Sequence, residues 1–297
     1  MEIPTIITDV TRRHDFVLLF DVSKGNPNGD PDAGNLPRTD PETMQGLVTD
    51  VAIKRKVRDY VDTARGQEQR FKIYVQHGEF LTPRRERVFN ERAGKGAKVE
   101  AKTGKEWMCD EFFDVRMFGA VMSMKEFNAG QVRGPIQLTF ANSIDPIVVL
   151  DHSIVGPAQN SKQAANANED DGAERTGTMG RKAYVPYGLY RAHGFFNARF
   201  AKDNGVQPED LALFWEALQN TWDLDRSAAR GEMACRGIYV FTHDDPRGLG
   251  NAPAHALFEL IEVAGSASAA PRSFADYEVK VRDGDLPAGV TLTRLAV

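Results

Sequence analysis

Acidic, amide, glycine and proline residues crowd one stretch, DVSKGNPNGDPDAGNLPRTDPE, which runs from Asp21 to Glu42. Residues of these types can serve three kinds of chemistry. Their oxygens can bind a metal ion, their carboxylates can form an acidic catalytic site, and their backbone amides can bind an anion. A metal-dependent ribonuclease would use Asp21, Asp30 or Asp32. The chemistry of this loop therefore decides whether the protein is an enzyme.

The loop does not match a calcium-binding loop. Such a loop places oxygen ligands at positions 1, 3 and 5 and a glycine at position 6. When the pattern starts at Asn28, the oxygens of Asp30 and Asp32 fit, but position 6 is Ala33. Prolines within the loop also restrict the backbone that would wrap an ion. We therefore expect no bound metal and no other cofactor.

A backbone platform for an anion is another interpretation of the same loop. Gly25, Asn28 and Gly29 tolerate positive φ, so consecutive amides there can converge on one anion. Lys24 adds a positive charge beside them. A plain connecting loop is equally consistent with these residues.

The next segment, ETMQGLVTDVAIKRKVRDYVD at 42–62, predicts a helix, with Asp40 as its cap and Pro41 at its first position. An apolar stripe at helical spacing begins it and then gives way to cations. The stripe is Met44, Leu47, Val48 and Val51, and the cations that continue it are Lys54, Arg55 and Arg58. Cations at this spacing can follow a phosphate backbone, although a solvated helix end would have the same composition.

Charge is distributed unevenly along the chain. The net charge of the 297 residues is −5, yet residues 70–105 contain ten Lys or Arg and four Glu, a net of +6. The rest of the chain therefore carries −5 − 6 = −11. This asymmetry indicates a basic surface on an acidic body, or alternatively a flexible insertion rich in lysine.

Other enzymatic motifs are weak. No histidine lies four residues from another with a glutamate between them, and the chain has no G-x-S-x-G and no phosphate-binding G-K-[ST] loop. Cys109 and Cys235 are far apart and outside nucleophile motifs, which is typical of reduced thiols in a cytoplasmic protein. No apolar run of about 18 residues is present, so we expect no membrane span and no membrane partner.

The order of the expected elements indicates an α+β fold. In chain order they are a strand at 16–23, a helix at 42–62, a strand at 134–153 bent near Pro146, a strand at 183–197, a helix at 207–224 and a strand at 235–245. This βαββαβ order is that of the ferredoxin-like or RNA-recognition fold. One insertion separates the first helix from the second strand; its segment 106–122 is apolar at near-helical spacing and predicts a helix that ends near Gly119. A polar excursion separates the two middle strands.

Several segments together resemble the repeating backbone subunit of type I-C CRISPR Cascade complexes, the Cas-seven family and its Csd-two type. They are FDVSKGNPNGDPDAGNLPRTDPETMQGLVTDVAIKRKVRDYV, FFDVRMFGAVM, VRGPIQLTFANSIDPI, TMGRKAYVPYGLYRAHGFFN and FTHDDPRGLGNAPAHALF. The resemblance covers nearly the whole chain. Its clearest parts are Asn28–Gly29–Asp30–Pro31 and Tyr187–Gly188–Leu189–Tyr190.

The resemblance implies a hand-shaped scaffold without catalysis of its own. Its palm would be a modified RNA-recognition fold made of 1–62, 134–151 and 184–297, with a finger insertion at 63–133 and a thumb at 152–183. Copies would polymerise along one CRISPR RNA in the cytoplasm and present it for pairing with target DNA, together with other Cascade subunits. Related type III subunits cut target RNA with a loop aspartate, which keeps the ribonuclease open as the alternative.

Holding RNA of any sequence requires phosphate contacts and groups that stack on or wedge between bases. Met179 is an adaptable apolar residue that suits wedging, although a methionine of no consequence is the alternative. The residues expected to contact RNA are Lys24, Asn26, Asn28, Arg38, Lys54, Arg55, Arg58, Gln137, Met179, Arg181 and Lys182.

Overall fold

The structure, a computed structural model, describes residues 3–156, 179–265 and 270–295. Its centre is an eight-stranded sheet in which every pair of neighbouring strands is antiparallel. The main path of the sheet runs β14 (Val290–Leu295), β11 (Glu232–His243), β1 (His14–Gly25), β10 (Met179–Phe196), β8 (Ala141–Pro146) and β4 (Gln45–Val48). Two further strands, β7 (Ile136–Leu138) and β9 (Leu150–Val155), also pair with β10. The expectation of an α+β fold is confirmed.

The central strand β1 is buried along nearly its whole length because strands flank both of its edges and further elements cover both of its faces. It pairs with β10 from His14–Phe196 to Gly25–Val185, and with β11 through a register shift between Leu19 and Phe20. Alternate side chains of β1 enter different hydrophobic clusters, as the period of two in a strand requires.

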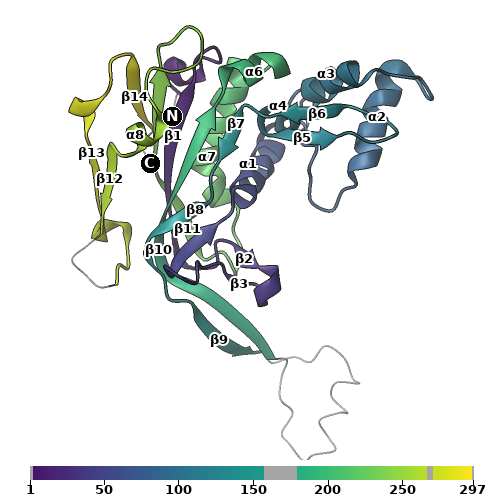
Figure 1. The fold of residues 1–297 in the computed structure, drawn as a ribbon. Helices are drawn as coiled ribbons and strands as arrows, with labels where there is room; N and C mark the ends of the chain where they lie inside the picture. The colour runs from purple at the N-terminus through teal and green to yellow at the C-terminus, as the bar shows by residue number, and fades with distance from the viewer. Residues whose placement is uncertain (1–2, 157–178, 266–269, 296–297) are drawn as a thin grey trace, which may run out of the picture.

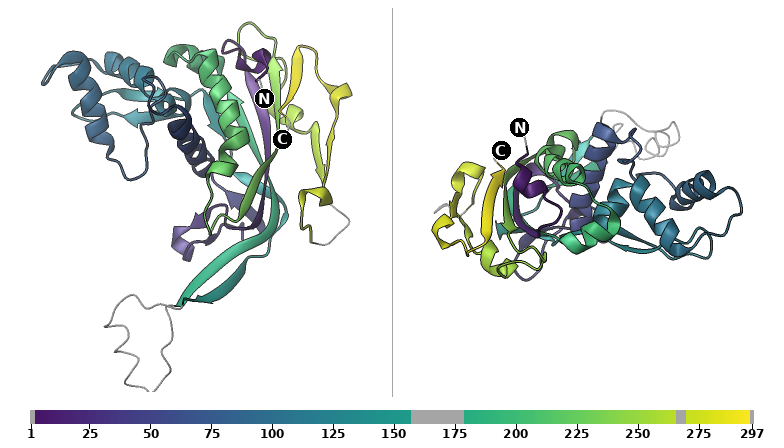
Figure 2. Two further views of the ribbon diagram at one scale, coloured as in Figure 1. Left: turned by 180° about the vertical axis from the view of Figure 1, so that it is seen from behind. Right: turned by 90° about the horizontal axis from the view of Figure 1, so that it is seen from above.

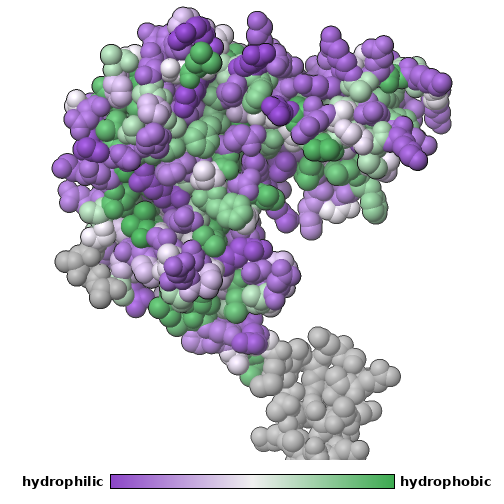
Figure 3. Space-filling view, viewed as in Figure 1, coloured by the Kyte–Doolittle hydropathy of each residue, from purple (hydrophilic) through white to green (hydrophobic). Residues whose placement is uncertain are grey.

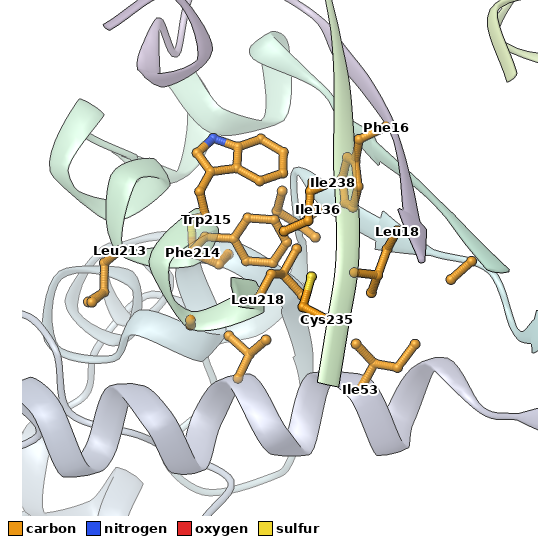
Figure 4. Close-up of a cluster of buried hydrophobic side chains, with 14 of the residues drawn as sticks. Phe16, Leu18, Ile53, Ile136, Leu213, Phe214, Trp215, Leu218, Cys235 and Ile238 are labelled. Carbon is orange, nitrogen blue, oxygen red and sulfur yellow. The ribbon is translucent and has the colours of Figure 1, made fainter. Parts of the chain in front are cut away.

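Two long helices, α1 (Asp50–Arg65) and α7 (Pro208–Leu224), cover one face of the sheet (Figures 1 and 2). Between them and the sheet lies the main core, where Phe16 of β1 packs edge-on against Phe214 and Trp215 of α7 (Figure 4). The indole Nε1 of Trp215 donates to the carbonyl oxygen of Ile7 at 2.9 Å, so the only polar atom of this buried ring is satisfied. The predicted helix at 207–224 is therefore confirmed as α7.

The opposite face of the sheet is covered by α8 (Ala254–Phe258) and the hairpin of β12 (Ile261–Ala264) and β13 (Glu278–Val281). These elements pack on Val17 and Leu19 of β1 in a second cluster. Figure 1 shows them on the side of the sheet away from the helices. Four short 3-10 turns complete this description: Thr5–Thr8, Pro31–Ala33, Phe274–Asp276 and Asp283–Asp285.

The insertion between α1 and the second half of the sheet forms a helical unit with its own core. It contains α2 (Leu81–Ala93), α3 (Ala101–Glu111), α4 (Phe113–Phe118), β5 (Gly119–Met122) and β6 (Gly130–Arg133). Figure 1 shows it projecting to one side of the central sheet, and α6 (Ala198–Asn204) lies at the top of the same view. Figure 3 shows apolar residues gathered on its underside; its exposed large hydrophobic residues are Val75, Phe80, Leu81, Val121 and Met124.

The strand β10 is longer than the main sheet. Its first residues, 179–184, leave the sheet and pair only with β9, and together they form a two-stranded arm that we call the ribbon (Figures 1 and 2). The predicted strand at 134–153 is split into β7, β8 and β9, and β8 ends at Pro146, the position of the expected bend. Among the described residues, no helix combines the length and the apolar composition that crossing a membrane requires.

Two helix predictions were partly wrong. The helix expected at 42–62 begins only at Asp50, because Thr49 caps it through a bond from the Ala52 amide to its Oγ1 at 3.3 Å. Residues 45–48 form β4 instead, since they pair with β8 almost 100 residues away. The helix expected from Glu106 to near Gly119 is broken at Phe112 into α3 and α4, but its end is confirmed, because α4 stops at Phe118 and residues 119–122 form a strand.

Candidate nucleic-acid interface

The opening loop, residues 24–40, folds into a small closed unit. Its β2 (Gly29–Asp30) pairs with β3 (Leu36–Pro37), and a 3-10 turn joins them. The Asp30 carboxylate accepts a bond from the Asp32 amide at 3.1 Å and so caps this turn. The loop is therefore a miniature hairpin held by its own side chains.

The predicted anion platform at Gly25, Asn28 and Gly29 was wrong. None of these three residues has positive φ; the loop's positive φ values fall at Lys24 (49°), Gly34 (61°) and Asn35 (63°). Gly25 is needed for a different reason, because a Cβ there would lie 1.8 Å from the carbonyl oxygen of Arg230. This glycine thus permits close packing of two backbone segments and does not aim their amides at an anion.

Two predicted RNA contacts, Asn28 and Arg38, take part in bonds within the opening loop and its surroundings. The Oδ1 of Asn28 accepts from the amide and the hydroxyl of Thr49 at 2.9 and 3.0 Å, which fixes the residue that caps α1. Arg38 is half-buried and forms an ion pair with Asp30 at 3.5 Å. Asn28 therefore positions the loop against α1, whereas Arg38 holds the loop to itself.

The acidic residues proposed for a ribonuclease do not gather. Asp21 is buried and accepts from Arg236 Nε at 2.8 Å and from the Tyr187 hydroxyl at 2.9 Å. Burial, followed by the charge of Asp21, raises the pKa of Tyr187, so this hydroxyl stays a donor. Asp32 is exposed. In the part of the chain that the structure describes, no three His, Cys, Asp or Glu side chains are placed to hold a metal ion.

The cations of α1 divide into paired and exposed ones. Lys54 contacts Asp50 at 2.8 Å, and Arg58 contacts the buried Asp114 of the insertion at 2.9 Å. Arg55 is 55% exposed and has only a loose contact with Asp59 at 3.8 Å. Of the three predicted cations of this helix, Arg55 is therefore the one whose guanidinium is most available to a ligand.

The buried face of α1 includes a cation that the sequence stripe did not predict. The stripe at Met44, Leu47, Val48 and Val51 does not exist as one helical face, because the first three precede the helix and Val51 is 64% exposed. Lys56 is buried instead and pairs with Asp225, and burial lowers its pKa.

Several predicted residues meet at the base of the ribbon. A pocket of about 180 Å³ lies where the opening loop, the ribbon and the segment before β11 come together; its lining includes Asn26, Asn35, Asp151, Arg181, Lys182 and Ala229. Arg181 pairs with Asp151 across the ribbon and keeps a side chain that is 78% exposed. Within the described residues Lys182 has no ion pair, and the exposed Lys24 precedes Gly25, whose partner in β10 is Val185. The structure thus brings Asn26, Arg181 and Lys182 together in one pocket and places Lys24 on the neighbouring strand β1.

Two predicted residues lie apart from this region or at the limit of the description. Gln137 is exposed in β7, pairs with Phe195 at the other end of β10, and donates to the Gly134 carbonyl at 3.0 Å. Met179 is the first residue of β10 and pairs with Val155. Residues 157–178 of the expected thumb lie outside the described residues, as does Gly177 beside Met179.

Arg230 is a part of the interface that sequence reasoning missed. Its Nη1 donates to the carbonyl oxygens of Asn26 and Pro27 at 3.2 and 3.4 Å, and its Nε lies 3.2 Å from Asp225. The Asn26 amide in turn donates to the Ala229 carbonyl at 2.7 Å. Arg230 therefore ties the opening loop to the segment before β11, about 200 residues away in sequence.

Comparisons with known proteins agree with this architecture. The sequence model of the family described as "CRISPR-associated protein Cas7" matches residues 12–282. A curated relative, the CRISPR-associated protein Cas7 of Haloferax volcanii, is 23% identical over 300 residues, which cover 91% of this chain and 81% of the relative.

Two solved structures are similar to the chain. A chain of a "CRISPR RNA-guided surveillance complex, pre-nicking" is 14% identical with a TM-score of 0.50, covering 78% of this chain and 79% of that one. A chain of a "CRISPR RNA-guided surveillance complex" is 16% identical with a TM-score of 0.49, covering 78% and 70%. The first of these likenesses indicates a shared fold.

Proposed function

The chain belongs to the CRISPR-associated protein Cas7 family, and we propose that it is the guide-RNA-binding backbone subunit of a Cascade surveillance complex. Copies of it polymerise along one CRISPR RNA in the cytoplasm and present that RNA for pairing with target DNA, beside other Cascade subunits. The type I-C form is the finer proposal, which the Asn28–Gly29–Asp30–Pro31 and Tyr187–Gly188–Leu189–Tyr190 segments support.

The observation that carries this proposal is the meeting of Asn26, Arg181 and Lys182 in the pocket at the base of the ribbon, with the exposed Lys24 next to Gly25, which pairs with Val185 of β10. An RNA backbone of any sequence is held by cations and by polar groups that contact phosphate and sugar. These residues come from segments far apart in the chain. The pairing of β1 with β10 joins the opening loop to the ribbon, and the Arg230 side chain joins the same loop to the segment before β11. A preformed pocket that presents cations and an amide suits a phosphate backbone better than a reacting centre.

The hand-shaped organisation is proposed on the arrangement of the elements. The strand order β11, β1, β10, β8, with α1 and α7 on one face, is the order expected of an RNA-recognition palm made of 1–62, 134–151 and 184–297. The insertion at 63–133 has its own hydrophobic core and serves as the finger. The ribbon begins the thumb, at 152–183.

Contact between copies is the second part of the proposal. Figure 3 shows apolar residues gathered on the underside of the insertion, and the exposed large hydrophobic residues of the insertion include Phe80 at 79% and Val121 at 77%. Exposed apolar patches on a protein surface typically mark interaction sites. We propose that this surface contacts a neighbouring copy or nucleic acid in the assembled filament.

Met179 is proposed to wedge between guide bases at the start of the ribbon. Unstacking one step costs a few kcal/mol, whereas affinity rests on many phosphate contacts, so Met179→Ala should leave assembly largely intact. A fluorescent base analogue at the displaced position should then show restored stacking. An unchanged signal with wild-type assembly would mean that Met179 is not the wedge.

Salt-dependent RNA binding tests the site. The full chain is titrated onto a single-stranded RNA at several salt concentrations, and Lys182→Ala is compared with Lys280→Ala, which removes an exposed lysine of β13. Loss of one phosphate contact should lower the salt slope by about 0.7 for a single strand. We expect this for Lys182→Ala and an unchanged slope for Lys280→Ala. Equal effects of the two variants would remove the ribbon base from the binding site.

A further inference from the structure

The carboxamide of Asn26 is incompletely bonded in the structure. The residue lines the pocket at the base of the ribbon and is only 4% exposed. Its Nδ2 donates to the carbonyl oxygen of Asn35 at 2.8 Å. Its Oδ1 is buried and has no hydrogen-bond partner among the described residues. Asn26 therefore lines the pocket and carries a shielded acceptor that lacks a donor.

The backbone of Asn26 prevents it from finding that donor by moving. Its amide donates to Ala229 at 2.7 Å, and its carbonyl accepts from Arg230 at 3.2 Å. With Nδ2 also engaged, the residue is fixed on three sides. Buried polar atoms without partners are rare in native proteins because they lose their bonds to water without replacement. A group that enters the pocket is the natural source of the missing hydrogen.

The neighbouring residues restrict what that group can be. Lys182 and Arg181 line the same pocket and are hydrogen-bond donors only, which suits the phosphates of a bound strand. Phosphate oxygens cannot donate to Oδ1. In a nucleotide, the remaining donors are the amino and imino groups of the bases and the 2′-hydroxyl of the ribose.

We propose that Asn26 Oδ1 accepts a hydrogen bond from a ribose 2′-hydroxyl, so that each subunit distinguishes RNA from DNA at one nucleotide of the strand it binds. This inference rests on the proposed function: a subunit that holds guides of any sequence cannot depend on a base edge, which leaves the sugar as the donor. The 2′-hydroxyl is also the group that separates RNA from DNA at a given site.

Single-atom changes in the RNA test the proposal without altering the protein. The full chain is bound to oligoribonucleotides that carry one 2′-deoxy substitution at each position in turn, in two unrelated sequences. We expect substitutions at positions that recur with the spacing of the subunits to weaken binding about three- to tenfold each, the value of one hydrogen bond. Asn26→Ala should bind the all-RNA strand more weakly and lose this sensitivity, whereas Lys182→Ala should bind more weakly and keep it.

The outcomes separate this inference from the proposed function. Strong binding of all-RNA that tolerates deoxy substitution at every position would overturn the role of Asn26 and leave RNA binding in place. A loss of binding affinity that depends on which base carries the deoxy substitution would also overturn the role of Asn26. Failure to bind RNA of either sequence would overturn both proposals. The wild-type scan gives this answer even where Asn26→Ala disturbs the loop.

Discussion

Arg116 of α4 and Asp210 of α7 form a fully buried ion pair that joins the helical insertion to a helix covering the central sheet. Nη2 of the arginine lies 2.5 Å from Oδ1 of the aspartate and Nε lies 3.0 Å from Oδ2, and neither side chain is exposed. The remaining donors of Arg116 reach the carbonyl oxygens of Cys109 and Arg70. Because both side chains are fully buried, this ion pair fixes the orientation of the insertion relative to α7.

Breaking this pair should destabilise the protein strongly. Arg116→Met leaves Asp210 buried with only Arg70 as a cationic partner, at 2.9 Å. Removal of one member of a buried pair costs about 3 kcal/mol or more, whereas an exposed pair contributes at most about 1 kcal/mol. In denaturant unfolding, the free energy of unfolding should fall strongly for Arg116→Met. It should hardly change for Arg226→Met, which breaks the exposed pair with Asp223. Similar losses for both would contradict the anchoring role of Arg116.

The stability of the fold should fall between pH 6.5 and 4 because of His14. Burial lowers the pKa of this histidine to about 4, from 6.5. Its ring is bonded to Thr242 Oγ1 and to the Asp9 carbonyl, both at 2.9 Å. As the pH falls, His14 is protonated in the unfolded chain before it is protonated in the folded one. The contribution of neutral His14 to the free energy of unfolding is therefore complete above pH 6.5 and is lost as pH falls towards 4.

The size of this effect is about 3 kcal/mol at the acid end, from a shift of roughly 2.5 pKa units. His14→Gln should therefore show a shallower decline in unfolding free energy over this window than the wild type. His77→Gln, at an exposed position, is the matched control and should leave the decline unchanged. A wild-type slope that survives in His14→Gln would assign the pH dependence to other groups.

The cations of α1 should have different roles. Arg55→Ala should lower the salt slope of RNA binding without a change in stability, since its side chain is exposed and loosely paired. Arg58→Ala should lower stability instead, because it removes the cationic partner of the buried Asp114. Paired measurements of RNA titration and denaturant unfolding distinguish the two effects. Equal loss of RNA affinity with unchanged stability in both variants would place Arg58 at the ligand.

Sequence patterns predicted the elements whose signals are local. The apolar run of β1 was sufficient to predict that strand. Pro208 at the start of α7 and the apolar content of the segment were sufficient to predict that helix. The strand β4 was not predictable, because Leu47 and Val48 suit a helix as well as a strand and pair with residues almost 100 positions away. There, a tertiary contact overrode the local preference.

The candidate site was predictable only in its residue types. Asn26, Arg181 and Lys182 could be singled out from the resemblance, but their meeting at one pocket depends on the path of β10 out of the sheet. Arg230 gave no sequence signal, since its acceptors at Asn26 and Pro27 are more than 200 residues away. The prediction of an anion platform was wrong because Gly25 allows the backbone of the opening loop to pack closely against the backbone at Arg230.

The ribonuclease alternative makes an opposite prediction about Asp30. Asp30 caps a turn within the opening loop and pairs with Arg38, which is a structural role. We expect the full chain with magnesium or manganese to leave a labelled RNA uncut, and Asp30→Ala to give the same result. Metal-dependent cleavage by the wild type that disappears in Asp30→Ala would establish the ribonuclease.

The number of protein copies bound per RNA tests the central claim most directly. Native mass spectrometry of the full chain with RNAs of increasing length and unrelated sequence measures it. A backbone subunit should add one copy for each fixed increment of RNA length, whatever the sequence, because each copy occupies a set number of phosphates. A single copy on RNAs of every length, or binding that depends on one sequence, would contradict the account.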